Sequence, residues 1–377
     1  MKKLLAVSLL ILFAAGFVFA GGGADRSTGE RTLIGMAMPE THVDRWLKDG
    51  RDLRTQAEKL GYSALVQWAD ANQLIQNGQI ESFVLQGAKA IIVGNINDGV
   101  APVVARAKAE GVQVIAYDRI IQNSDAYDYY ITFNNFKVGE FQGQAIVDGL
   151  SLTTATTAAP KYITLFAGSP TDGNAFFFYD GAYSKLKPFI DSGVLRVVGP
   201  HPATSADRAN FQRIATENWM PNIAKTRMEN LLTGDARSVT LDAVLAPNDT
   251  LGMAIIEALK ADAKYRTKLP VVTGQDAQFA SMLSIKNGEQ YMTVFKDTSK
   301  LAEAAVLLAD QLLKGQRVNV PGSVVAADIG LASIGNTGRK TVTAILLDPI
   351  LVTRNSNFLA PVNAAGWFTA SENAQLR

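Results

Sequence analysis

Polar and charged side chains directly follow four short apolar runs of this chain. The four groups are Tyr117-Asp118-Arg119, Asn248-Asp249, Gln275-Asp276 and Phe295-Lys296. Carboxylates accept hydrogen bonds, arginine and lysine donate them, and amides do both. Neighbouring hydroxyl groups each donate and accept, so this combination suits a ligand that carries several hydroxyls. The alternatives are a surface ion pair for Asp118 and Arg119 and helix caps for the two amide-carboxylate pairs, a role for which Asp249 is well placed.

Two tryptophans and an arginine could complete such a site. Arg45-Trp46 follows the first strand-to-helix turn, and this pair suits a sugar, because hydroxyls take the arginine donors while the C–H face lies on the indole. Trp219 lies in a polar connection with little core to join, which favours a second stacking face. Asn174 heads a helix that Asp172 can cap, which leaves its amide for a ligand. The alternatives are that Trp46 packs beneath its own helix with Arg45 in solvent, and that Asn174 is itself the cap.

Carboxylates at strand ends could also act as general acid and base. A pair drawn from Asp118, Asp249 and Asp276 could in principle flank a glycosidic bond. Each of them, however, stands next to an amide or a cation, which favours an ionised, hydrogen-bonding carboxylate over an acid with a raised pKa. We therefore expect a binding protein rather than an enzyme, with a glycosidase as a minor alternative.

The sequence lacks most of the residues and motifs that enzymes commonly use for catalysis. It has no cysteine and only two histidines, His42 and His201, so a thiol nucleophile is excluded and a zinc site of ordinary composition is not expected. No strand is followed by a Gly-x-Ser-x-Gly elbow, a Walker loop or a Gly-x-Gly-x-x-Gly fingerprint. The formal charge is +1 without a basic patch, so no nucleic-acid partner is expected. We expect no metal and no other cofactor.

The first twenty residues have the pattern of a cleaved signal peptide. Lys2 and Lys3 precede an apolar run that ends in Val18-Phe19-Ala20, and residues 21–31 read as a flexible linker. The absence of cysteine removes the residue that carries a lipid anchor. A soluble exported protein without a tether is best retained in a periplasm. A retained N-terminal anchor and secretion to the outside are the alternatives.

Strand-like and helix-like segments alternate along the rest of the chain. In the first series, strands are expected at 32–38, 64–68, 90–94 and 112–117, and helices at 43–60, 73–85 and 100–110. After an aromatic strand at 129–133, a second series begins with a helix at 136–150 and has strands at 162–167, 195–198, 243–246, 271–273 and 292–295. A helix at 300–313 and a strand at 343–347 follow late in the chain. This pattern predicts an α/β protein with two doubly wound parallel-sheet lobes. Ligands of such sheets bind outside the carboxyl ends of the strands, where the polar groups lie.

The chain is long enough for two domains, and the alternation indicates how it is divided. We expect a first lobe from residues 32–130 with 298–333 and a second lobe from 131–297 with 334–377. The lobes would be joined by a hinge of several segments.

Several motifs, taken in order, give the mature chain a strong resemblance to the periplasmic monosaccharide-binding proteins of ABC transporters, of the xylose-binding and multiple-sugar-binding subfamily. They are Ile34-Gly35-Met36-Ala37-Met38 with Arg45-Trp46, Val114 to Arg119, Gly168-Ser169-Pro170 with Asn174 to Ala182, Leu186-Lys187-Pro188, Gly274 to Ala277 and Val294 to Asp297. The resemblance implies a type I periplasmic binding protein fold that closes on a sugar about its hinge. It covers nearly the whole mature chain.

Nine site residues are assigned by matching these motifs. The resemblance implies that Arg45, Trp46, Asp118 and Arg119 line the cleft on the first lobe, and that Asn174, Trp219, Asn248, Asp276 and Lys296 line it on the second lobe or at the hinge. The two tryptophans would sandwich the pyranose. The chain departs from the family at Asp172-Gly173-Asn174-Ala175, where the family has Asp-Asn-Asn-Ala, and the lost amide bears on the choice of sugar epimer. The Trp219 region matches only as Trp-x-Pro.

The function implied is capture of a free aldohexose or aldopentose, such as xylose, glucose, galactose or arabinose, by a monomer that delivers it to the permease of an ABC importer. One alternative is a sensory protein that presents the sugar to a chemoreceptor or sensor kinase. Another is a sugar-responsive repressor with the same core, which would need an N-terminal helix-turn-helix where this chain has its leader.

Overall fold

The apolar runs of the first half of the chain form a seven-stranded sheet. The computed structural model describes residues 31–325, 335–354 and 358–377, so the predicted signal peptide and most of the predicted linker lie outside the described residues. The strands are β1 (Leu33–Met38), β2 (Ser63–Trp68), β3 (Ala90–Val93), β4 (Gln113–Tyr117), β5 (Tyr129–Phe133), β11 (Val324–Val325) and β12 (Thr343–Leu347). Their order is β11-β12-β5-β4-β3-β1-β2, and all neighbours are parallel except β11 and β12.

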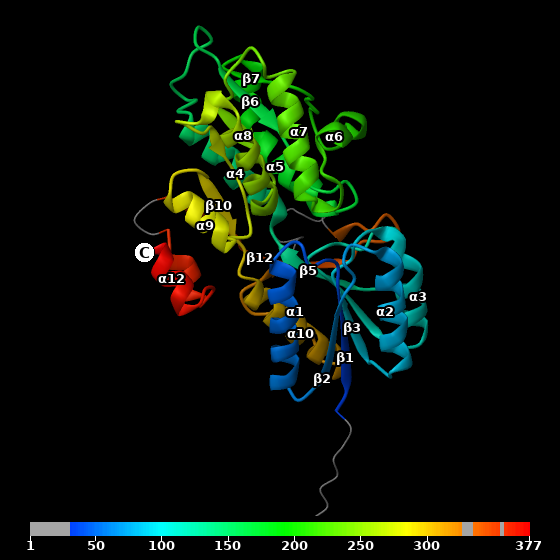
Figure 1. Ribbon diagram of the computed structural model, residues 1–377. Coiled ribbons are helices and arrows are strands. Elements are labelled where there is room, and N and C mark those ends of the chain that lie inside the picture. The colour runs from blue at the N-terminus through cyan, green and yellow to red at the C-terminus, as the bar shows by residue number, and fades with distance from the viewer. Residues whose placement is uncertain (1–30, 326–334, 355–357) are drawn as a thin grey trace, which may run out of the picture. The chain divides into compact units, whose positions relative to one another are not determined.

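Helices cover both faces of this sheet. Helices α1 (Arg45–Lys59) and α10 (Thr298–Leu313) pack together on one face, and α2 (Gln73–Leu85) and α3 (Ala101–Ala109), preceded by η1 (Asp98–Val100), lie on the other (Figure 1). Both faces of the sheet are therefore dry, which explains why its central strands are apolar throughout instead of alternating. We call the seven-stranded sheet and these helices the first lobe.

The second series folds around a smaller parallel sheet. Its order is β7 (Leu195–Val197), β6 (Lys161–Leu165), β8 (Ala243–Leu245) and β9 (Val271–Val272). The helices of this part are α4 (Asn135–Gly149), α5 (Gly173–Asp191), α6 (Arg208–Ile214), α7 (Pro221–Thr233), α8 (Asp249–Ala261) and α9 (Phe279–Lys286), with short 3-10 turns η2 (Glu217–Trp219) and η3 (Ala263–Tyr265). These elements, together with residues 292–295, 350–353 and 358–377, form the second lobe.

One predicted strand pairs differently from the expectation. The strand β10 (Met292–Phe295) does not join the parallel sheet but pairs antiparallel with β13 (Ile350–Thr353), a strand that the sequence analysis did not predict. The chain then closes with α11 (Ala360–Ala364) and α12 (Ala370–Leu376), which share a small apolar core with α9 and β10.

Glycines let helices α4 and α5 pack with their backbones nearly in contact. A Cβ at Gly139 would lie 2.1 Å from the carbonyl oxygen of Phe178, and one at Gly181 would lie 2.1 Å from that of Phe136. Larger side chains would force these helices apart. The close packing matters for function because the first turn of α5 carries residues of the site described below.

Three segments connect the lobes. The chain crosses between β5 and α4, between β10 and α10, and between β12 and β13. These crossings are the candidate segments of the predicted hinge, and the sheet contradicts the lobe boundaries expected at residues 130 and 333. Strand β5 runs to Phe133, and β12 pairs with it along its full length, so residues 131–133 and 343–347 belong to the first lobe. A strand joins the sheet whose edge strand it can hydrogen-bond to. The residues of the strand do not specify which sheet that is.

No helix in the described ranges is both long and apolar enough to cross a membrane. Those same ranges contain no group of three or more histidine, aspartate or glutamate side chains placed to hold a metal ion.

Candidate sugar-binding site

The nine predicted site residues line one cavity. It is bounded by residues of both lobes, and its space measures about 20 Å³. Its lining consists of Val43, Arg45, Trp46, Asp118, Arg119, Asp172, Asn174, Phe178, Trp219, Asn248, Gln275, Asp276 and Lys296. That volume admits a water molecule or two, so a sugar could enter only if the lobes separate and the side chains exchange their present partners.

Strand ends and helix starts bring these side chains together. Asp118 follows β4, Lys296 follows β10, and Arg45 begins α1 immediately after the β1 loop. Three of the lining residues have left-handed backbones, with φ of 62° at Asp118, 55° at Trp219 and 96° at Asp276. Such conformations cost about 1–3 kcal/mol each and persist only where the surroundings enforce them. Three such residues around one cavity indicate that the protein holds these side chains in position at the cost of backbone strain.

Arg45 is the centre of a buried ion cluster. Its Nη2 lies 2.7 Å from Asp49 Oδ2 and 2.8 Å from Asp118 Oδ2, and its Nη1 lies 4.0 Å from Asp276 Oδ1. Burial by itself would raise the pKa of Asp118, but Arg45, Lys296 and Arg119 outweigh it, so this pKa is lowered from its ordinary value. Asp118 is thus an ionised acceptor, as the sequence suggested, and not a reservoir of protons for catalysis.

Arg119 forms a second cluster that joins the lobes. Its guanidinium lies 2.6 Å from Glu40 Oε1 in the first lobe and, through Nε, 2.9 Å from Asp172 Oδ2 in the second. The other contact of that Asp172 oxygen is the indole Nε1–H of Trp219, at 3.2 Å. The orientation of Trp219 is therefore tied to Arg119 through a shared carboxylate. Neither Asp118 nor Arg119 forms the solvated surface pair that was the alternative, because both are buried.

Lys296 and Asp276 form the third ion pair of the cavity. Lys296 Nζ lies 2.9 Å from Asp276 Oδ1 and 5.5 Å from the ring centre of Phe178. Both partners are about 5% exposed, so they are almost completely withdrawn from water. A buried pair of this kind is weak evidence for added stability, because the desolvation of the two charges opposes their attraction.

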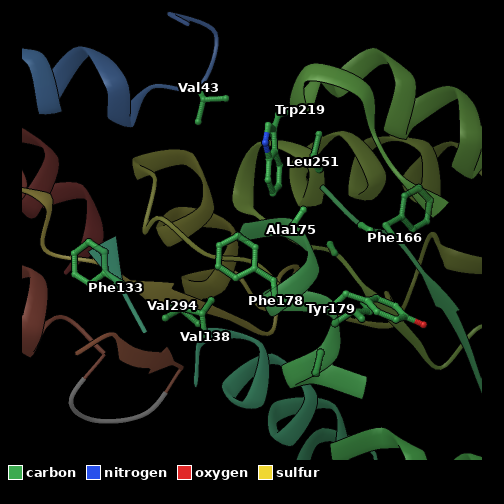
Figure 2. Close-up of a cluster of buried hydrophobic side chains, with 14 of the residues drawn as sticks. Val43, Phe133, Val138, Phe166, Ala175, Phe178, Tyr179, Trp219, Leu251 and Val294 are labelled. Atoms are coloured by element: carbon green, nitrogen blue, oxygen red, sulfur yellow. The ribbon is translucent and has the colours of Figure 1, made fainter. Parts of the chain in front are cut away.

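Both tryptophans are buried and line the cavity. The Trp46 ring centre is 4.7 Å from Arg45 Cζ and 5.0 Å from Arg119 Cζ, so its face meets two guanidinium groups. Trp219 lies against the backbone of Gly168, where a Cβ would be 2.0 Å from the indole. Figure 2 shows Trp219 pointing toward Ala175 and Phe178, whose ring centre is 6.4 Å away. Gly168 of the Gly-Ser-Pro motif is thus required for the indole to reach this position.

The two asparagines have partners within the protein. Asn174 Nδ2 donates to the Asp118 carbonyl oxygen at 2.8 Å, and its Oδ1 accepts from Tyr130 and Asn135, so it links the lobes as well as lining the cavity. Asn248 is the N-cap of α8, because its side-chain oxygen accepts a hydrogen bond from Leu251 N. The cap role considered for Asp249 is therefore filled by Asn248. Asp172 caps α5, as expected.

Four lining residues were missed by the sequence analysis as site residues. Asp172 was assigned only as a cap, Gln275 was noticed beside Asp276 but not assigned, and Val43 and Phe178 are apolar residues that sequence alone places in a core. Two buried atoms of the lining, Arg45 Nε and Gln275 Oε1, have neither a hydrogen-bond partner nor an ion pair among the described residues, whereas Arg119 Nε and Asp276 Oδ1 lack hydrogen bonds but are ion-paired. An unpartnered donor and an unpartnered acceptor beside one cavity are the groups that a hydroxyl can satisfy together.

Asp249 is buried beside the bend that carries Gln275 and Asp276, and it should make the stability of the protein depend on pH. Burial and the charge of Asp276 raise its pKa to about 8, although it accepts hydrogen bonds from Gln290, Gln278 and Thr293. The expectation of an ionised carboxylate is therefore wrong for Asp249, because its neighbouring amide does not offset its burial. Between about pH 4 and pH 8 the folded protein then holds a proton that the unfolded chain, with a pKa of about 3.9, has lost. The free energy of unfolding should fall as pH rises through this window, by up to about 1.4 kcal/mol per pH unit, and level off above it.

Chemical denaturation of the wild type and Asp249→Asn at several pH values between 4 and 9 measures this effect. The wild type should lose stability relative to the variant as pH rises, whatever the absolute cost of the substitution. The exposed Asp191→Asn is the control and should follow the wild type. Parallel profiles for the wild type and Asp249→Asn would show that Asp249 is ionised throughout.

Comparison with known proteins identifies the relatives of this chain. Residues 34–317 match the family model described as "Periplasmic binding protein domain". The chain is 38% identical to the multiple sugar-binding periplasmic receptor ChvE of Rhizobium radiobacter over 97% of this chain and 98% of that protein. It is 37% identical to the D-xylose-binding periplasmic protein of Escherichia coli K12, over 86% and 87% of the two chains.

A solved structure agrees with the sequence relatives. The crystal structure of an ABC transporter solute-binding protein from Clostridium phytofermentans with bound β-D-glucose has a TM-score of 0.81 and 34% identity, and covers 92% of this chain and 100% of that one. These relatives are binding proteins, and the prediction that the chain is not an enzyme is confirmed at the level of the family. The predicted fold class is confirmed as well, and the chain belongs to the periplasmic binding protein family, among its sugar-binding members.

Proposed function

We propose that this protein captures a free monosaccharide between its two lobes in the periplasm and delivers it to an ABC importer. The observation that carries the proposal is the lining of the cavity. Three cations and three carboxylates, all engaged in ion pairs, surround it together with two indoles and the unpartnered atoms of Arg45 and Gln275. A pyranose or furanose has hydroxyl edges and apolar C–H faces that match these two kinds of surface.

The cavity also suggests how binding proceeds. Hydroxyls would replace part of the contacts between Arg45 and Asp118 and between Lys296 and Asp276, so that each charged group exchanges a protein partner for the sugar. Charge-assisted hydrogen bonds in a site without water are stronger than neutral ones. Separation of the lobes and closure about the three connecting segments would admit the sugar, a motion that is general among periplasmic binding proteins.

Relatives narrow the class of ligand. Among similar proteins one is named for multiple sugars, another for D-xylose, and structures similar to this chain contain D-glucose. We therefore infer an aldopentose or aldohexose, with D-glucose and D-xylose as the first candidates. We expect the protein to act as a monomer whose closed form is recognised by the permease; presentation to a sensor would use the same closed form.

Titration of the purified chain with glucose, xylose, galactose, arabinose and ribose tests the proposal. Saturable binding at micromolar or tighter affinity is expected, measured by calorimetry and by the fluorescence of the buried tryptophans. Absence of saturable binding to all five sugars would refute the assignment. Reconstitution with the cognate permease, followed by sugar-dependent ATP hydrolysis, would then test delivery separately from binding.

A further inference from the structure

The C-terminal segment, residues 358–377, packs directly behind two side chains of the cavity. Ala277 and Phe295, the chain neighbours of Asp276 and Lys296, are buried in the apolar core that this segment shares with α9 and β10. The segment therefore supports, from outside the cavity, the backbone on either side of the Lys296 and Asp276 ion pair. None of the residues assigned from the sequence lies in it.

Trp367 makes the two contacts that matter in this segment. Its indole Nε1–H donates to the Ala277 carbonyl oxygen at 3.1 Å, and its ring meets that of Phe295 edge-on at 4.9 Å. Asp276 and Ala277 are both in the left-handed region, with φ of 96° and 47°, so this bend needs external support. Trp367 supplies it at the carbonyl that follows the Asp276 carboxylate.

Trp367 also touches the first lobe. Lys48 Nζ, on α1 one turn after Arg45, lies 4.6 Å from the Trp367 ring centre, within the range of a cation–π contact. The ammonium is held in place by Asp52 and Ser299 of its own lobe. Arg45 and Asp276 line the sugar cavity and also a neighbouring cavity of about 390 Å³ that Lys48 and Trp367 share. The Lys48 and Trp367 contact therefore lies on the outer side of the same ion pairs.

We propose that Trp367 is a positioning residue for ligand capture. It fixes the Asp276 bend in the second lobe and holds the first lobe through Lys48 when the cleft is closed, so that the C-terminal segment stabilises the closed form without touching the ligand. This inference rests on the proposed function, because it concerns the same cleft. Since the contact with Lys48 joins the lobes, losing it should speed release of the sugar more than it slows capture.

Three variants test the proposal in the full chain, with D-glucose and D-xylose as probes. Trp367→Phe keeps an aromatic face but loses the N–H, Trp367→Leu loses both, and Lys48→Met loses only the cation. We expect the dissociation constant to rise about two- to fivefold for Lys48→Met, from the usual strength of a cation–π contact. Trp367→Phe should raise it by about two- to tenfold, and Trp367→Leu by more than either.

A matched control and melting temperatures separate positioning from folding. Lys187→Met removes an exposed lysine of the second lobe that lies outside the cleft, and it should bind as the wild type does. For Trp367→Phe and Lys48→Met, the melting temperature without sugar should stay within a few degrees of the wild type, while its increase at a saturating sugar concentration should shrink.

The outcomes distinguish this inference from the proposed function. If the wild type binds a sugar and the dissociation constants of Trp367→Leu and Lys48→Met equal that of the wild type, the inference is overturned and the proposed function stands. An equal loss of melting temperature with and without sugar in Trp367→Phe would also overturn it, because it would assign Trp367 to stability alone. A wild type that binds neither probe nor any other sugar of the panel would refute the function, and the inference with it.

Discussion

Replacing Asp118 with asparagine should weaken monosaccharide binding about 100-fold or more while leaving the protein folded. The carboxylate is the ionised acceptor at the centre of the cavity, and an amide of the same shape loses the charge that Arg45 and Lys296 stabilise. A hydrogen bond to a charged group contributes about 1.5–3 kcal/mol, and an unpaired buried charge costs more. Calorimetric titration with the sugar that the wild type binds most tightly measures the loss.

The fold should survive this substitution for a specific reason. The backbone carbonyl of Asp118, not its side chain, accepts hydrogen bonds from Tyr130, Thr132 and Asn174, and asparagine tolerates the left-handed φ of 62°. Arg45 also keeps Asp49 as a partner. Asp128→Asn, an exposed carboxylate that pairs with Lys340, is the control and should bind normally. Unchanged affinity in Asp118→Asn would mean that the site lies elsewhere.

Replacing Lys296 with methionine should abolish binding and also destabilise the protein. The substitution leaves Asp276 buried with only Arg45, 4.0 Å away, as a counter-charge. Removing one partner of a buried ion pair typically costs about 3–5 kcal/mol, because the remaining charge is uncompensated. Denaturant unfolding measures this loss, and Lys300→Met, which removes a lysine that is 71% exposed four residues later, should show almost none.

A second substitution separates stability from binding at this pair. Adding Asp276→Asn to Lys296→Met removes the stranded charge, so the double variant should recover most of the lost free energy of unfolding. It should still fail to bind the sugar, because the charged donor and acceptor are both gone. Recovery of binding in the double variant would show that the pair serves the fold and not the ligand.

Much of the architecture was predictable because its signals are local. Helix α2 and strands β5, β10 and β12 have the bounds that their apolar patterns indicated, and the other predicted elements differ by a residue or two at their ends. The predicted lobe boundaries were less accurate, because the sequences of β5 and β12 do not indicate that these two strands pair with each other. For the same reason β13 went unpredicted and β10 was assigned to the wrong sheet.

The candidate site was predictable in part for a related reason. The rule that ligands bind outside the carboxyl ends of parallel strands grouped the side chains that follow β4, β9 and β10. The structure brings these side chains to one cavity, but from three different sheets, and β10 pairs antiparallel. Phe178 could not be grouped with them, because it stands in a run of four aromatic residues on α5 and only the rotation of that helix selects which ring faces the cavity.

The sequence by itself determined the family, the alternation of strands and helices, and the set of charged, amide and indole side chains available to a sugar. These depend on residue type and on short-range order along the chain. The tertiary structure decided which charges pair with which, that Asn248 rather than Asp249 caps its helix, and that Trp367 supports the Ala277 carbonyl from 90 residues away in the chain. These depend on distances between segments, which packing of the two lobes sets and no local pattern encodes.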